Sequence, residues 1–209
     1  MFAATRTSVV WPEKVDDVLR LYASWVAGSD VAGAQLMLAL ADRDIGSGLA
    51  LGVYPTEDDL AQGGDLADVL LRRAGSMFAV APIRETYEVF INAVPAPPTL
   101  VTSEAPLFAR VTTLRMIPAA IDEAFGIVQQ NVLKVSQQQR GHRGFIGLGN
   151  RETGKTASVV LWESESALHA SEHSGNYQNQ LARIARFLRE PPAREVYEVI
   201  ALRVADAST

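Results

Sequence analysis

The spacing of apolar residues in the first part of the chain predicts a strand, a helix and a hairpin. Residues 5–11 are rich in β-branched side chains and stop at a proline, which is typical of a strand. From Glu13 apolar residues recur every three or four positions, so we expect a helix that closes at Gly28. The apolar runs 34–41 and 48–54 flank a polar connector that contains glycine, which predicts a β-hairpin.

A second helix and a last strand complete this first set of elements. Thr56 and Asp59 have the spacing of a capping box, so the helix is expected to start near Glu57. The pair at 63–64, Gly-Gly, is expected to interrupt this helix because glycine has low helix propensity. Residues 85–92 form the last predicted strand. The order is therefore strand, helix, strand, strand, helix, strand.

The second half of the chain repeats this order after a proline-rich segment. Residues 94–107 contain several prolines and are expected to act as an extended linker between unit 1–93 and unit 108–209. The predicted elements are a strand at 108–115, a helix at 121–135, a hairpin of 141–148 and 157–162, a helix capped by Ser164 and broken at 174–175, a helix at 177–188 and a strand at 195–203.

A sequence repeat supports the division into two units. Residues 82–90 and 192–200 match at Pro, Arg, Glu, Tyr, Glu and Val without a gap. Residues 54–60 pair with 162–168 in the same way. Self-similarity at such a separation indicates that one structural unit occurs twice.

The repeated element order corresponds to the ferredoxin-like βαββαβ arrangement, an antiparallel sheet with both helices on one face. The last strand, 195–203, has apolar residues on both of its faces, so the face without helices also needs a cover. We therefore predict an α+β protein in which two tandem ferredoxin-like units pack sheet to sheet as a dimeric α/β barrel within one chain.

Composition excludes several classes of function. The chain has 209 residues, a net charge of −5 and no block of basic residues, so nucleic acid is not an expected partner. No apolar run reaches the roughly 18 residues that a membrane span requires, and no membrane partner is expected. The chain has no cysteine, which excludes disulfides and thiolate chemistry and suits a cytoplasmic protein.

The second unit resembles the antibiotic biosynthesis monooxygenase family of dimeric α/β barrels. The resemblance rests on Gly144-Phe145 at a strand start, the segment 162–168 (Trp-Glu-Ser-Glu-Ser-Ala-Leu) and the last strand with Tyr197. It covers residues 108–203 well and residues 4–92 more loosely. Most members have one unit per chain and pair as homodimers, so this resemblance implies a fused pair.

The resemblance also implies an activity. Family members that oxidise polycyclic phenols or anthrones use no metal or flavin, because the deprotonated substrate itself reacts with O2. Their pocket lies between sheet and helices and is lined by a Trp, a Tyr six residues later and an Asn four residues earlier. In this chain these positions are Trp162, Leu168 and Ser158. In the first unit they are Tyr54, Leu60 and Ala50, so the second unit is expected to carry the site.

The resemblance gives no support for a bound cofactor. The Asn, Trp and His of the heme-degrading branch of the family would fall near Arg110, Ser171 and Leu181, and none of the three matches. Glu165, His169 and His173 share a helix face at four-residue steps and could approach a metal, but a solvated histidine pair explains the same spacing. We predict neither a cofactor nor a metal.

The leading hypothesis is a cofactor-independent monooxygenase-like protein that acts on a bulky aromatic or quinol-like molecule. In it Trp162 stacks on the substrate, and His169, His173 and Tyr177 supply polar contacts from the helical side. Catalytic residues are not assigned. The alternative is a non-catalytic small-molecule-binding or stress-associated barrel. The family's dimer contacts could also serve to associate two fused chains as a homodimer.

Overall fold

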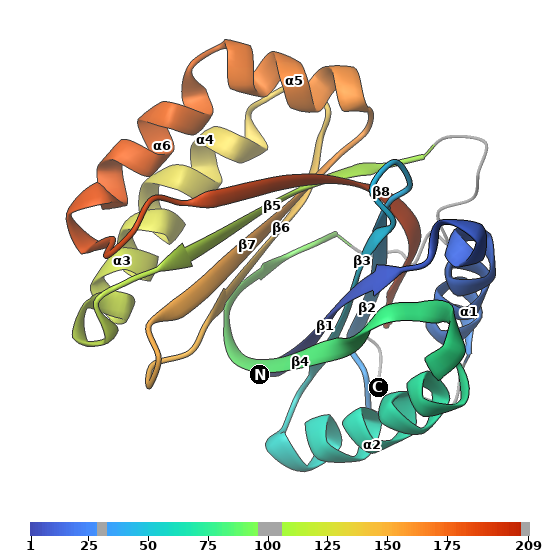
Figure 1. The fold of residues 1–209 in the computed structure, drawn as a ribbon. Coiled ribbons are helices and arrows are strands. Elements are labelled where there is room, and N and C mark those ends of the chain that lie inside the picture. Colours follow the sequence, from blue (N-terminus) through green and yellow to red (C-terminus); the bar gives the residue numbers. More distant parts are fainter. Residues whose placement is uncertain (29–32, 96–105, 206–209) are drawn as a thin grey trace. The chain divides into compact units, whose positions relative to one another are not determined.

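The computed structural model describes residues 1–28, 33–95 and 106–205, so most of the predicted linker lies outside the described residues. The chain divides into two compact units (Figure 1). Unit 1 contains Met1–Thr86 and the chain from Tyr197 onward, and unit 2 contains Tyr87–Pro95 and Leu107–Val196. No helix among the described residues is long and apolar enough to cross a membrane.

The first repeat has the predicted element order. Its elements are β1 (Phe2–Val10), α1 (Val15–Ala27), β2 (Leu36–Asp42), β3 (Ser47–Tyr54), α2 (Glu57–Arg73) and β4 (Phe78–Ala93), with short 3-10 turns at Pro12–Lys14 and Gly75–Met77. The predicted capping box is present, because the amide of Asp59 donates to Thr56 Oγ1 at 3.1 Å and this hydroxyl lies 2.6 Å from Asp59 Oδ2.

The prediction that Gly63 and Gly64 interrupt the second helix is wrong, because α2 runs through both residues without a break. The glycines allow close approach of two side chains to the helix backbone. A Cβ atom on Gly63 would lie 2.5 Å from the ring of Tyr54, and one on Gly64 would collide with the guanidinium of Arg84. At position 63 the cost of glycine in a helix is therefore offset by packing that no other residue permits.

The surroundings of three helical glycines predict three different effects of a glycine-to-alanine change on stability. Gly63→Ala is expected to lower the free energy of unfolding by about 1–3 kcal/mol, because the ring of Tyr54 is buried and has no space to move into. Gly126→Ala, in the second repeat, should raise it by about 0.5–1 kcal/mol, since nothing lies within 4 Å of the added methyl group. Gly64→Ala should be near neutral, because Arg84 is flexible. Urea unfolding followed by circular dichroism measures all three, and a stabilised Gly63→Ala would contradict the packing described.

The second repeat also has the predicted order. Its elements are β5 (Phe108–Arg115), α3 (Ile121–Ile127), a π-helical segment (Val128–Val132), α4 (Leu133–Gln137), β6 (His142–Gly149), β7 (Lys155–Trp162), α5 (Glu165–His173), α6 (Asn176–Ile184) and β8 (Ala193–Val204), with 3-10 turns at Pro118–Ala120 and Ala185–Phe187. Ser164 caps α5 by accepting a hydrogen bond from the amide of Ala167 at 3.1 Å. Gly175 adopts a φ of 77° at the predicted break between α5 and α6.

The strands of the described residues hydrogen-bond in the order β1-β3-β2-β8-β5-β7-β6-β4 and form a closed barrel. The C-terminal part of β4, from Glu88 to Ala93, pairs with β6, and the C-terminal part of β8, from Glu198 to Val204, pairs with β2. This order confirms the predicted α+β barrel of two ferredoxin-like repeats.

Each unit has its own hydrophobic core. In unit 1, Tyr22 and Trp25 of α1 pack with Tyr54 of β3 and Leu60 of α2. In unit 2 the core contains Phe125, Trp162, Leu168 and Ile184, which come from α3, β7, α5 and α6. The layer between sheet and helices, where the resemblance places the family's pocket, is therefore largely filled by side chains in both units.

Candidate functional site

A cavity of about 50 Å³ remains between the sheet and the helices of unit 2. Its walls are mostly apolar and come from β5, β6, β7, α3, the π-helical segment and α6. The polar residues that line it are Arg110, Thr112, Thr156, Ser158, Tyr177 and Gln180. A mostly apolar cavity with a few convergent polar groups is the usual form of a small-molecule site.

Arg110 is the most unusual residue of this cavity. It lies in the middle of β5, on the same strand face as Thr112 and Leu114, and only 2% of its surface is exposed. Its guanidinium carbon lies 4.3 Å from the centre of the Tyr177 ring and 5.7 Å from that of Trp162. The two aromatic faces stabilise the cation and fix the plane of its donors.

Two donors of this buried cation make no hydrogen bond to any described residue. These atoms are Nε and Nη1 of Arg110. The carboxylate that lies nearest, on Glu172, is 3.7 Å from Nη1, which is an ion-pair contact but too long for a hydrogen bond. Burial lowers the pKa of Arg110, and the negative charge of Glu172 partly opposes this effect. Arginine nevertheless stays protonated in proteins, so the cavity contains a positive charge whose N–H donors are not all used by the protein.

Other buried polar atoms of unit 2 also have no hydrogen-bond partner among the described residues. Trp162 Nε1, His142 Nε2 and Ser171 Oγ belong to this group. The ring of His142 meets that of Trp162 edge to face at 5.8 Å. Burial, together with the charge of Arg110, lowers the pKa of His142 and so favours the neutral imidazole. Unpartnered buried polar groups are rare in proteins and cost free energy, so such a group of them indicates a site for a polar ligand.

Unit 1 also has a buried arginine, Arg6, on its first strand; it takes the register position of Thr112 rather than that of Arg110, and it makes three hydrogen bonds. Arg6 of β1 donates to Asp68 Oδ1 from Nε at 2.9 Å and from Nη2 at 2.7 Å, and Nη2 also donates to the carbonyl oxygen of Gly64 at 2.8 Å. The cavity between Arg6 and the aromatic side chains Tyr22 and Trp25 has only about 20 Å³, so this part of unit 1 is largely filled by side chains. A second pocket of about 510 Å³, which opens to the surface, is lined by Arg6, Asp68 and Arg84.

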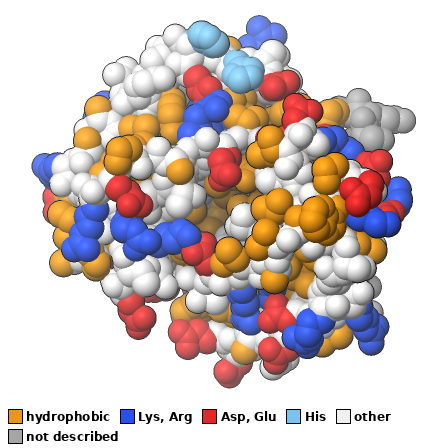
Figure 2. Space-filling model, viewed as in Figure 1, with side chains coloured by type: hydrophobic (Ala, Val, Ile, Leu, Met, Phe, Trp, Pro, Cys, Tyr) orange, Lys and Arg blue, Asp and Glu red, His pale blue; other side chains and the backbone are white. Residues whose placement is uncertain are grey.

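The structure separates the four site residues expected from the sequence. Tyr177 lines the cavity, and its hydroxyl lies 3.3 Å from that of Thr112. Trp162 is completely buried and packs behind Arg110 without lining the cavity. His169 and His173 lie on α5 and do not line the cavity; His173 is exposed and His169 is half-exposed. Figure 2 shows pale blue histidine side chains at the surface.

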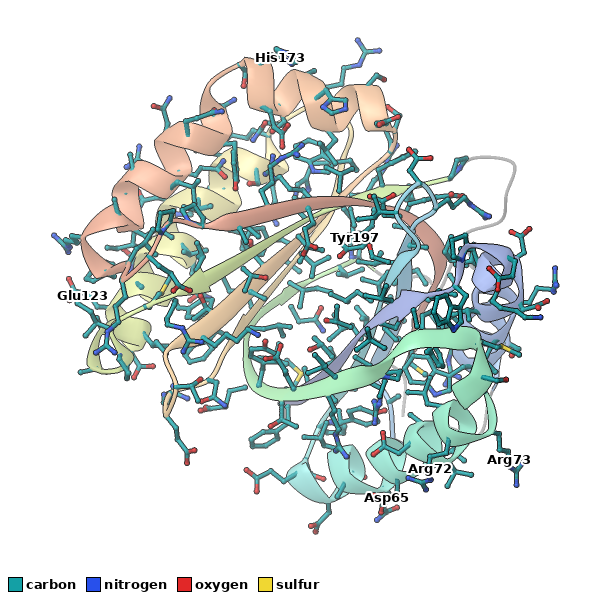
Figure 3. All side chains as sticks on the ribbon, viewed as in Figure 1. Asp65, Arg72, Arg73, Glu123, His173 and Tyr197 are labelled. Atoms are coloured by element: carbon teal, nitrogen blue, oxygen red, sulfur yellow. The ribbon has the colours of Figure 1, made fainter. Side chains whose placement is uncertain are left out.

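The two histidines are held by local contacts on α5. His169 lies 3.5 Å from Glu165, and Nδ1 of His173 lies 2.8 Å from the carbonyl oxygen of His169. His173 is on the side of the helix that faces away from the sheet of unit 2 (Figure 3). Among the residues that the structure describes, no three histidine, aspartate or glutamate side chains are grouped to hold a metal ion.

The two other residues at the family's pocket positions, Ser158 and Leu168, lie in different surroundings. Ser158 lines the cavity, whereas Leu168 belongs to the apolar core. Arg110 was not among the expected site residues. The signal for it was present in the sequence, because a single charged residue interrupts the strand 108–115 in alternation with Thr112 and Leu114.

Comparison with known proteins supports the fold. No family model and no curated protein matches the chain. Solved structures that match it over their full length include a "putative monooxygenase" of Lactobacillus acidophilus NCFM (10% identity, TM-score 0.72, 97% of this chain and 95% of that one). A "putative monooxygenase" of Fusobacterium nucleatum matches at 11% identity and a TM-score of 0.77, over 97% of this chain and 94% of that one.

A third structure, described as an anthrone oxidase-like protein, matches at 15% identity and a TM-score of 0.70, over 100% of this chain and 94% of its own. In all three cases one chain spans both repeats of the present protein, so the tandem arrangement is shared with them. The sequence-based resemblance is therefore confirmed at the level of the fold: the chain has the tandem α/β-barrel fold of these three structures, two described as putative monooxygenases and one as anthrone oxidase-like.

Proposed function

We propose that unit 2 carries out a monooxygenase-like reaction on a small aromatic or quinol-like molecule, which binds in the cavity as an anion beside Arg110. The observation that carries this proposal is the buried guanidinium with two unpartnered donors in an otherwise apolar cavity. A phenolate or enolate oxygen accepts hydrogen bonds from such donors, and its aromatic body suits the apolar walls. The fold shared with a protein described as anthrone oxidase-like is consistent with a monooxygenase-like reaction and suggests anthrone as the first compound to test.

The chemistry that the resemblance implies needs no further reductant. An anthrone loses a proton from its ring CH2 group to give an electron-rich anion, which transfers electrons to O2. In the complete reaction the CH2 carbon becomes a C=O group, one oxygen atom enters the product and the other leaves as water. Arg110 would favour the anion by lowering the pKa of the bound substrate, as an opposite charge at close range does. The hydroxyl pair of Thr112 and Tyr177 lies in the same cavity and, because Tyr177 is half-buried, can pass the proton to solvent.

Entry of a ring requires movement of cavity side chains. The cavity of about 50 Å³ is smaller than the roughly 150 Å³ that holds a benzene molecule in an engineered protein core. Tyr177 and Leu181 of α6 are half-buried and form the wall closest to solvent. Displacement of these two side chains is the least costly way to enlarge the site.

An oxygen-uptake assay tests the proposal. With anthrone as substrate, the wild-type protein should consume one O2 per anthrone oxidised, at a rate well above that of buffer, and the Arg110→Met variant should reduce this rate to the buffer level. Arg6→Met is the matched control and should retain the rate. Equal rates with wild-type protein and with buffer would contradict the catalytic proposal.

One observation favours the alternative of a non-catalytic binding protein. The described lining of the cavity includes no carboxylate and no imidazole, so it has no strong general base. Saturable binding of anthrone without oxygen uptake would select this alternative.

A further inference from the structure

We propose that Arg194, the arginine of the repeated sequence segment, is a positioning residue. It binds the carboxylate of Glu172 and thereby keeps the guanidinium of Arg110 available for an anionic ligand. This inference rests on the proposed function, since it explains what leaves the donors of Arg110 unpaired.

The geometry around Glu172 carries the inference. Arg194 donates from Nε to Oε1 and from Nη2 to Oε2, both at 2.6 Å, so one guanidinium holds both carboxylate oxygens. Arg110 Nη1 approaches the same Oε1 only to 3.7 Å. His169 Nδ1 lies 3.7 Å from Oε2. Glu172 is 15% exposed, so its carboxylate is held in place beside the buried cation rather than solvated freely.

Unit 1 has a comparable set of a carboxylate and two arginines, with the opposite distribution of hydrogen bonds. The carboxylate is Asp68 of α2, the buried arginine is Arg6, and the second arginine is Arg84, which is the repeat equivalent of Arg194. Arg6 holds the carboxylate with two hydrogen bonds, at 2.7 and 2.9 Å, whereas Arg84 makes a single contact at 3.3 Å. The buried arginine of unit 1 is consequently satisfied within the protein.

The difference between the units has a simple electrostatic consequence. A carboxylate that forms a bidentate ion pair with one guanidinium has few lone pairs left for other donors, and its charge is largely neutralised. In unit 2 the positive field of Arg110 is therefore not cancelled, so an anion can approach it. Without Arg194, Glu172 would either bind Arg110 as Asp68 binds Arg6, or remain as a negative charge that repels the ligand. Both outcomes weaken anion binding.

Affinity for 2-naphthoate, which is anionic and does not react with O2, tests this role by isothermal titration calorimetry. Arg194→Ala should weaken binding of 2-naphthoate at least tenfold. In the double variant Arg194→Ala/Glu172→Gln the affinity should return to within about threefold of that of the single variant Glu172→Gln. The Arg194→Lys variant should bind 2-naphthoate with intermediate affinity, because a lysine neutralises the charge of Glu172 but cannot form the bidentate hydrogen bonds. Arg84→Ala is the matched control from unit 1 and should leave the affinity unchanged. Equal weakening in Arg194→Ala and in the double variant would overturn the proposal, as would an unchanged Arg194→Ala.

A second measurement needs no ligand and separates this inference from the proposed function. Arginine side-chain ¹⁵N NMR reports the rotation of each guanidinium, and Arg110→Lys identifies the signal of Arg110. In Arg194→Ala the Arg110 guanidinium should rotate more slowly than in the wild type, and Glu172→Gln should abolish the difference. If the wild type does not bind 2-naphthoate, the anion site fails; if Arg194→Ala changes neither the rotation of Arg110 nor the affinity, the role of Arg194 fails.

Discussion

Replacement of Arg110 by methionine is expected to weaken binding of 2-naphthoate by at least about 100-fold while leaving the fold intact. A hydrogen bond to a charged group contributes about 1.5–3 kcal/mol, and each 1.4 kcal/mol changes affinity tenfold, so the loss of two such bonds, roughly 3 kcal/mol or more, corresponds to at least this factor. Methionine retains an apolar chain that packs against Tyr177 and Trp162. Calorimetric titration of the variant against the wild type measures the effect.

The same variant and its counterpart in unit 1 should separate binding from stability. The donors Nε and Nη1 of Arg110 are unpaired and its guanidinium is desolvated, so Arg110→Met should leave the free energy of unfolding unchanged or raise it. Arg6→Met removes three hydrogen bonds and should lower it by about 1–3 kcal/mol while ligand affinity is kept. Guanidinium unfolding of both variants provides the comparison. Loss of stability in Arg110→Met without loss of affinity would identify Arg110 as a structural residue.

Replacement of Trp162 by alanine should cost about 3–5 kcal/mol of unfolding free energy, because the side chain is completely buried in the core of unit 2. Trp11→Ala is a suitable control, since Trp11 is 48% exposed and its loss should change stability by less than about 0.5 kcal/mol. Thermal unfolding at equal concentration measures both changes.

The conservative variant Trp162→Phe distinguishes a packing role from substrate stacking. Trp162 supports Arg110 from behind and does not line the cavity, so Trp162→Phe should bind 2-naphthoate with an affinity within threefold of the wild type. A tenfold or larger loss in a folded Trp162→Phe protein would show that the ring contacts the ligand directly, as the family resemblance implies.

The fold was predictable from the sequence because its information is local and is given twice. The strand 108–115 was predicted with the bounds that β5 has, and the start of α2 followed from its capping box. The path of α2 through Gly63 and Gly64 was not predictable, since it depends on the ring of Tyr54 packing against the helix backbone. The early start of β4 at Phe78 was also missed, because Pro82 and the exposed positions around it resemble a loop.

The candidate site was less predictable because it depends on tertiary contacts. The segment that begins at Trp162 identified the fold, and Tyr177 of α6, which we expect to contact the substrate from the helical side, does line the cavity. The four-residue spacing of His169 and His173 does place them on one side of α5, but the buried positions of this helix are Leu168 and Ser171. Whether Arg110 forms hydrogen bonds within the protein depends on which arginine binds the carboxylate of Glu172. The spacing of residues in the sequence does not predict this.

The central claim is that the cavity of unit 2 binds an anion through Arg110. Its most direct test is an arginine side-chain ¹⁵N NMR titration of the wild-type protein with 2-naphthoate and, in parallel, with the neutral 2-naphthalenemethanol. We predict that 2-naphthoate shifts the Nε signal of Arg110 saturably, that the signal of Arg6 does not move, and that the neutral alcohol binds at least tenfold more weakly. Saturable binding of 2-naphthoate with an unchanged Arg110 signal, or equal affinity for the alcohol, would contradict the claim.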